Sequence, residues 1–241
     1  MEDIFDLSIR RDRLYEQVAE QIQDMIVAAS LHPGDKLPSE RELAEQLGIS
    51  RTVVREAIHA LSIRGLVKVK PGCGAYVREL SLEDAAAPFE LLLRLRQTGD
   101  TIANLYEVRL MVETEIAGLA AQRASDEDIA ALEMVIAEME AHTDDPARFA
   151  GYDMAFHTAL AKATKNDLFT VLMSSIGNLS QEMILISYHA PGAPADGVEH
   201  HRTILESIKT HDPEGARHAM RKHVLHSVRL VEAVNQQVGS S

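Results

Sequence analysis

The chain has few of the features that mark secreted or membrane proteins. It contains a single cysteine, Cys73, so an internal disulfide framework is excluded and a reducing compartment is expected. No run of about eighteen apolar residues is present, and the charged N-terminal segment lacks the apolar core of a signal peptide. We therefore expect a soluble, cytoplasmic protein without a membrane partner. Cys73 is interpreted as an incidental exposed thiol, with redox sensitivity as the alternative.

Motifs that carry common enzyme chemistry are also missing. The sequence contains no H-E-x-x-H pair, no nucleophile elbow, no phosphate-binding loop and no G-x-G-x-x-G segment. No residue is therefore predicted to be catalytic.

The segment from Gly34 to Leu61 predicts two short amphipathic helices joined by a tight turn. Ser39 is expected to cap the first helix, Gly48 to end it and Ser50 to cap the second. The first helix has its apolar face at Leu43, Ala44 and Leu47. The second repeats apolar residues at helical spacing at Val54, Ala57, Ile58 and Leu61. Its outward face carries Arg51, Thr52 and Arg55. This pattern is typical of a helix-turn-helix, whose second helix enters the major groove. A helical hairpin with exposed arginines is the alternative.

Residues 66–77 predict a β-hairpin with a glycine-rich tip, directly after the second helix. Leu66 to Lys70 alternates as a strand, Pro71 to Gly74 forms the tip, and residues 75–77 return. A further helix is expected over residues 14–28. Three helices followed by a hairpin predict a winged-helix DNA-binding domain over residues 1–78.

The net charge of −13 is unevenly distributed along the chain. Residues 36–78 hold 8 basic against 4 acidic residues, whereas residues 79–241 hold 13 basic against 25 acidic residues. A locally basic segment attached to an acidic remainder favours one orientation on a polyanion. The acidic total is therefore compatible with DNA binding through residues 36–78.

Three segments resemble the GntR family of bacterial transcription regulators: YEQVAEQIQDMI, LPSERELAEQLGISRTVVREAIHAL and GCGAYV. The resemblance implies DNA contacts by Arg41, Arg51 and Arg55, together with the glycines of the wing tip. The predicted DNA-binding residues are Arg41, Ser50, Arg51, Thr52, Arg55, Gly72 and Gly74. Arg51 and Arg55 each offer a bidentate fork for guanine.

The rest of the chain predicts helices only, so the fold class is mainly α, with an all-α bundle of six or seven helices after the winged helix. Expected helices cover residues 84–97, 100–123, 125–141, 168–186, 198–210 and 212–234, with one more starting at Asp145-Pro146. Residues 191–197 (PGAPADG) are predicted to form a loop. The expected parts are residues 1–78, a linker and short connecting helix over 79–99, a bundle over 100–236 and a disordered tail over 237–241.

Histidines carry the chemistry of the predicted bundle. Asp153 and His157 lie four residues apart and share a helical face, while His201 and His223 fall on the apolar faces of two other helices. Three imidazoles and a carboxylate suit a divalent metal such as Zn²⁺ or Ni²⁺. Histidines packed in a core without metal are the alternative. His200 competes with His201 for the same role, whereas His218 and His226 are expected to be exposed or peripheral.

The bundle resembles the ligand-binding domain called FCD, found in the FadR subfamily of the same regulators. Its metal-binding members carry three segments that read DMAFH, HRTIL and AMRKH here. The resemblance implies a metal bound by Asp153, His157, His201 and His223: zinc first, with nickel or manganese as alternatives. It also implies a small carboxylate or sugar-acid effector that completes the metal shell. Arg109 is the candidate partner of that carboxylate, with a salt bridge to Glu113 as the alternative.

These observations predict a homodimeric repressor that binds a short palindromic operator and responds to the effector. Three alternatives remain open: a structural metal site completed by water, a DNA-binding protein whose helical part only dimerises, and a metal-dependent enzyme fused to a winged helix.

Overall fold

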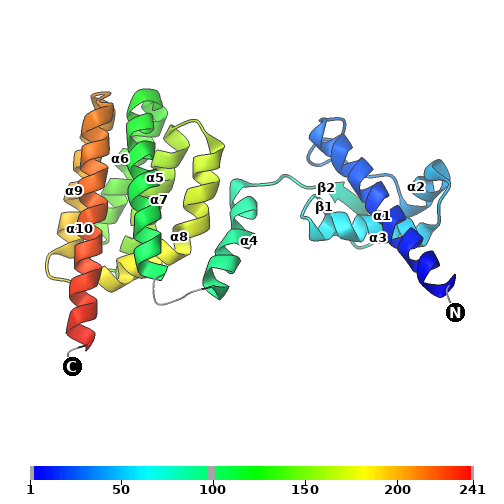
Figure 1. Ribbon diagram of the computed structural model, residues 1–241. Helices are drawn as coiled ribbons and strands as arrows, with labels where there is room; N and C mark the ends of the chain where they lie inside the picture. Colours follow the sequence, from blue (N-terminus) through cyan, green and yellow to red (C-terminus); the bar gives the residue numbers. More distant parts are fainter. Residues whose placement is uncertain (1–2, 97–100, 240–241) are drawn as a thin grey trace. The chain divides into compact units, whose positions relative to one another are not determined.

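A computed structural model describes residues 3–96 and 101–239 of the chain. It divides the protein into two compact units, Met1–Asp84 and Ala85–Ser241 (Figure 1).

The first unit contains three helices and a two-stranded antiparallel hairpin. In chain order these are α1 (Asp3–Val27), α2 (Glu40–Leu47), α3 (Arg51–Ile63), β1 (Val67–Lys70) and β2 (Gly74–Val77). Helix α1 begins eleven residues before the predicted start at Leu14. Helix α3 packs against α1, α2 and β1, and buries Val54, Ala57 and Leu61 in the core of this unit. The predicted winged helix-turn-helix is thus confirmed.

Local sequence signals set the boundaries of α2 and α3. The Ser39 hydroxyl accepts a hydrogen bond from the Glu42 backbone N–H, and the Glu42 carboxylate accepts one from the Ser39 N–H at 2.7 Å, which completes a capping box. Gly48 ends α2 with φ of 65°, a left-handed conformation that glycine adopts without strain. Ser50 then caps α3. Leu47, predicted on the apolar face, is instead 37% exposed because it lies in the last turn of α2.

The hairpin pairs Val67 with Val77 and Lys70 with Gly74. Gly72 and Gly74 have φ of 72° and 109°, which explains why the tip is rich in glycine. Cys73 lies between them and is exposed.

Among the described residues of the second unit, the regular secondary structure is helical only. The helices are α4 (Leu82–Leu95, which starts just before the unit boundary), α5 (Thr101–Arg123), α6 (Asp126–Ala141), α7 (Pro146–Ala163), α8 (Asp167–Ser187), α9 (Ala193–Lys209) and α10 (Pro213–Gly239). Helices α5 and α10 lie side by side, and α7 packs against α6, α8 and α5 (Figure 1). Ser125 and Asp128 form the expected capping box of α6, and Asp145 caps α7 ahead of Pro146. The predicted cap Asp100 lies outside the described residues.

Two boundaries in the second unit also differ from the sequence prediction. The loop predicted over residues 191–197 is wrong, because α9 already begins at Ala193. Gly192 turns the chain with φ of 80°, and Pro194 sits in the first turn, where its missing N–H removes no hydrogen bond. Helix α10 continues to Gly239, past the predicted end near Val234 and into the segment predicted as a tail, whose last two residues are not described.

Four apolar side chains of α4 are largely uncovered within the second unit. Phe89, Leu92, Leu93 and Leu95 are 60%, 48%, 38% and 76% exposed. In the part of the chain that the structure describes, α8 alone is long and apolar enough to cross a membrane. Its residues Met173 and Ile176 are buried in the bundle, and core helices of soluble proteins pass the same test.

Candidate metal centre and DNA interface

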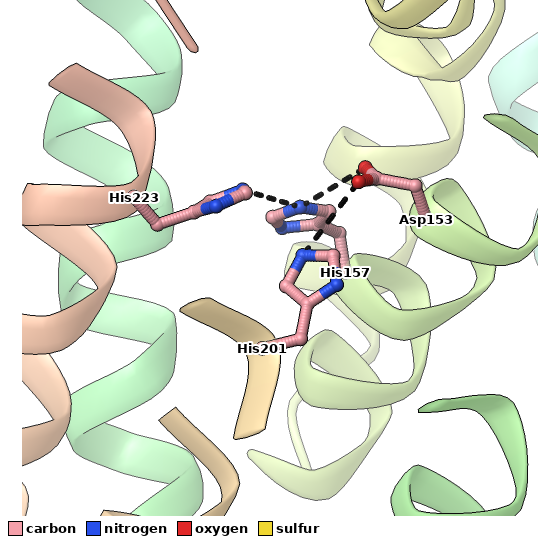
Figure 2. Close-up of side chains that lie close together, drawn as sticks. All are labelled: Asp153, His157, His201 and His223. Atoms are coloured by element: carbon pink, nitrogen blue, oxygen red, sulfur yellow. Dashed lines mark hydrogen bonds and ion pairs between the residues drawn. The ribbon is translucent and has the colours of Figure 1, made fainter. Parts of the chain in front are cut away.

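Three helices bring the four predicted metal ligands together inside the second unit. Asp153 and His157 come from adjacent turns of α7, His201 from α9 and His223 from α10 (Figure 2). All four are buried, and each offers a ligand atom within 4.8 Å of the others. Helix spacing on α7 and the packing of α9 against both α7 and α10 therefore produce one compact donor set.

The distances between these donor atoms suit a single cation. His157 Nε2 lies 3.5 Å from Asp153 Oδ1 and 3.3 Å from His223 Nε2, and His201 Nε2 lies 3.7 Å from Asp153 Oδ2. Ligands bound at about 2.1 Å from one ion lie about 3.0 to 3.4 Å apart in octahedral or tetrahedral shells. Asp153 Oδ1 and His201 Nε2 are buried and have no hydrogen-bond partner. Unpaired buried donor atoms at this spacing fit a divalent metal.

Glu113 is a buried residue of this site that sequence reasoning named only as a possible partner of Arg109. Arg109 Nε donates to Glu113 Oε1 at 2.5 Å, and both side chains are 1% exposed. The second Glu113 oxygen lies 2.7 Å from His157 Nδ1, on the side of the ring that faces away from the other ligands. The spacing of Arg109 and Glu113, four residues apart on α5, was a signal for the pair. Nothing in the sequence indicated its contact with α7.

Burial has the largest influence on the pKa of each of these groups, and neighbouring charges decide the outcome. Burial alone raises the pKa of Glu113, but Arg109 and then His157 hold it well below its usual range. For His157, Glu113 outweighs burial and raises the pKa to about 9. Burial lowers the pKa of His201 to about 3 and that of His223 well below 6.5. His201 and His223 are thus neutral near pH 7, as metal ligands must be.

The remaining histidines of α9 and α10 occupy different environments. His201 rather than His200 belongs to the donor set, and its ring stacks on Phe156 at 4.3 Å between centroids. His218 is exposed as predicted, whereas His226, predicted to be peripheral, is only 25% exposed. A cavity of about 30 Å³ adjoins the donor set, and Asp153, His223 and His226 are among the residues that line it.

The predicted DNA-binding residues are all exposed. Side chains of Arg41, Arg51 and Arg55 are 73%, 62% and 64% exposed. The Ser50 hydroxyl accepts a hydrogen bond from the Val53 N–H, so the observed role of Ser50 is a helix cap. Thr52 on α3 and the hairpin-tip residues Gly72 and Gly74 are exposed.

Glu40 on α2 is a residue of this surface that the sequence did not indicate. Its carboxylate accepts hydrogen bonds from Arg55 Nε at 3.1 Å and from Arg55 Nη2 at 2.8 Å. Arg51 Nη2 lies 4.0 Å from the same carboxylate. One acidic side chain of α2 therefore pairs with two arginines of α3.

Comparisons with known proteins match both the N-terminal winged-helix part and the C-terminal helical part of the chain. The family of bacterial regulatory proteins called gntR matches residues 14–77, and the FCD domain matches residues 104–226. The Uxu operon transcriptional regulator of Escherichia coli (strain K12) is 33% identical over 92% of this chain and 89% of its own length. The HTH-type transcriptional repressor NanR of Edwardsiella tarda (strain FL6-60) is 31% identical over 89% of this chain and 84% of its own.

A solved structure of Streptococcus agalactiae GntR covers 90% of this chain and 100% of that chain, with 30% identity and a TM-score of 0.73. Fold, motifs and relatives together define a transcription regulator with a helix-turn-helix DNA-binding part and an FCD effector-binding part. The chain belongs to the GntR family. Its families and relatives are transcription regulators, not enzymes, so the enzyme alternative has no support.

Proposed function

We propose that this protein is a cytoplasmic, homodimeric repressor whose operator binding is controlled by a small carboxylate or sugar acid at a metal in the FCD domain. The observation that carries the proposal is the buried donor set of Asp153, His157, His201 and His223 in a chain that also carries a winged helix. The functional parts are residues 1–78, a connecting stretch over 79–99 and the bundle over 100–236. The repressor role is supported by the similarity to NanR.

The metal would be held by the three Nε2 atoms and one Asp153 oxygen, with zinc as the first candidate and nickel or manganese as alternatives. When bound, it supplies positive charge and open positions for a carboxylate. Glu113 Oε2 lies 2.7 Å from His157 Nδ1, so the proton that His157 gives up on metal binding is the one on Nε2, and the Nδ1 proton stays beside Glu113. This arrangement orients the ring before any ion arrives.

Arg109 supports the carboxylate part of the proposal. One of its terminal nitrogens, Nη1, is buried without a hydrogen-bond partner, although Glu113 occupies the rest of the guanidinium. An unpaired N–H of this kind suits an incoming carboxylate. The salt bridge to Glu113 and the contact with an effector are therefore compatible roles, because they use different nitrogens.

The cavity beside the donor set explains how the effector would act. About 30 Å³ accommodates roughly two water molecules, which is too little for a three-carbon acid. We therefore expect binding of an acid to move the cavity walls, which include Ala193 and Gly197 at the start of α9. A coupling of about 1–3 kcal/mol between this movement and DNA binding changes operator affinity about 5- to 150-fold. A structural site filled by water fits the small cavity as it stands and is the second candidate.

Untagged protein tests the metal and effector together. We expect elemental analysis to give one tightly bound metal per chain, and a thermal-shift screen of small acids to reveal one that stabilises the protein. His157→Ala and His223→Ala should lose both metal and acid response while the winged helix stays folded. Tight metal with no response to any acid favours the structural alternative, and stoichiometric metal in both variants refutes the donor set.

The DNA part is tested with an operator selected from a random pool of duplexes. Two-fold symmetry of a homodimer predicts that the selected sequence is a short palindrome. Arg51→Ala and Arg55→Ala should each lose about 1–3 kcal/mol of discrimination, as expected for a bidentate guanine contact. Arg221→Ala, an exposed arginine on α10, serves as the control. Full operator affinity in either variant of α3 would overturn the assignment.

A further inference from the structure

The cavity beside the donor set has an aromatic wall to which the proposed function gives no role. Phe149 lies one helical turn before Asp153 on α7, so the two side chains share a helical face, and both line the cavity. Phe149 is 3% exposed, and its ring meets the ring of Tyr188, another lining residue, edge to face at 5.6 Å between centroids. The space next to the predicted metal ligand Asp153 is therefore bounded by an aromatic side chain.

Packing from α8 and α9 holds the Phe149 ring at this wall. The Tyr188 hydroxyl donates to the Thr143 backbone oxygen at 2.7 Å, which fixes the ring against which Phe149 packs. On the α9 side, a Cβ atom at Gly197 would lie 3.2 Å from Phe149 Cζ, closer than ordinary van der Waals contact. The absence of a side chain at Gly197 therefore lets α9 lie directly against the ring. Because protein interiors are close-packed, a ring held in this way does not leave the cavity wall without displacing a helix.

The space that the Phe149 ring leaves free is small. A cavity of about 30 Å³ holds roughly two water molecules, which is the room that the two oxygen atoms of one carboxylate need. Each further carbon of an acid therefore requires a displacement of the cavity wall. One methylene more or less in a closely packed pocket changes discrimination between ligands about 10- to 200-fold. A fixed ring at this wall thus sets a steep limit on the length of the acid.

We propose that Phe149 determines the size of the effector: it admits acids of two or three carbons and excludes six-carbon sugar acids. The ring acts by occupying the space into which a longer chain would extend from a carboxylate bound at the metal. This inference rests on the proposed function, because it places the acid in the cavity lined by Asp153 and His223. It also narrows that function, since sugar acids no longer belong to the candidate effectors.

A series of acids that share one head group and differ in length tests the proposal. Glycolate, glycerate, threonate and gluconate each carry a 2-hydroxycarboxylate, and calorimetry measures their binding to the untagged, metal-containing protein. We expect the two shorter acids to bind at least about tenfold more tightly than gluconate. Phe149→Leu and Phe149→Ala should each reduce that preference at least about tenfold, because the longer chain gains the space of the ring. Gly197→Ala adds a methyl group to the wall and should weaken binding of glycerate more than that of glycolate.

Phe169→Leu is the matched control, because Phe169 packs against the same core from α8 but lies outside the cavity lining. It should leave the order of the four affinities unchanged, since a lost core contact weakens every complex alike. Metal content shows whether the donor set is intact in each variant, and Phe149→Leu keeps an apolar side chain if Phe149→Ala does not fold.

Two results separate this inference from the proposed function. An unchanged preference in Phe149→Leu with its metal retained overturns the inference and leaves the proposed function standing, as does tightest binding of gluconate by the unmodified protein. Absence of binding of every acid to every metal-containing variant instead removes the carboxylate sensor, and the size limit with it.

Discussion

Substitution of Glu113 by glutamine leaves a buried arginine without its counter-charge. Arg109 and Glu113 are each 1% exposed, and the Arg109 guanidinium cannot release its proton. Removing one partner of a buried ion pair costs about 3–5 kcal/mol, because the other charge stays buried and uncompensated. Glutamine preserves the volume, so no cavity contributes to this cost. The expected loss is a large part of the roughly 5–15 kcal/mol that stabilises a typical protein.

Helix α5 offers a matched control two residues further on. Glu115 pairs with Arg217 at 3.1 Å, but Glu115 is 57% exposed, and exposed ion pairs contribute only about 0–1 kcal/mol. Both variants should be unfolded in urea with a chelator present, at one fixed protein concentration, and followed by far-ultraviolet circular dichroism. With an m-value of about 1–3 kcal/mol per molar urea, Glu113→Gln should lower the midpoint by about 1–5 M. Equal shifts for Glu113→Gln and Glu115→Gln would refute the reasoning.

Three further outcomes are expected. The raised pKa of His157, about 9 against 6.5 unfolded, stabilises the metal-free protein below pH 6.5 and loses that effect as pH rises to 9. Because the pKa values of His201 and His223 are lowered, the free energy of unfolding decreases as the pH is reduced from 6.5. Urea unfolding at several pH values should therefore give a maximum of the unfolding free energy near pH 6.5. A flat profile would contradict this expectation. Zinc binding near pH 7.5 should release about one proton, from His157, as measured by calorimetry in two buffers of different ionisation enthalpy. Glu40→Gln should tighten binding to random-sequence DNA duplexes about three- to tenfold, because Arg55 loses its ion-pair partner and can contact phosphates. Glu56→Gln makes the same charge change on α3 and is the control, with the smaller effect expected of charge alone.

Features encoded within a few residues were predictable from the sequence. The capping box at Ser39, the left-handed Gly48 and the hairpin tip each depend on neighbours in the chain. The clustering of the four donor residues was also predictable from the sequence, because Asp153 and His157 lie one helical turn apart and His201 and His223 lie on apolar helix faces. Helical periodicity is enough to predict that such residues face the core of the bundle.

Contacts between helices distant in the sequence were not predictable in the same way. Glu113 contacts His157 because α5 packs on α7, and Glu40 meets Arg55 because α2 packs on α3. The start of α9 was misplaced because proline and glycine residues signal a turn and a first helical turn equally well. Residue type alone does not separate those two cases.

The hairpin tip provides an experimental handle that needs no engineered mutation. Cys73 is the single thiol of the chain, and it is exposed at the tip between two glycines. A nitroxide attached there would be free of background labelling, and its mobility would report whether the tip contacts a duplex. In the proposed homodimer, two such labels give one inter-tip distance, measurable by pulsed electron paramagnetic resonance with and without the acid. The unmodified chain therefore allows the inter-tip distance to be compared between the effector-free, effector-bound and DNA-bound protein.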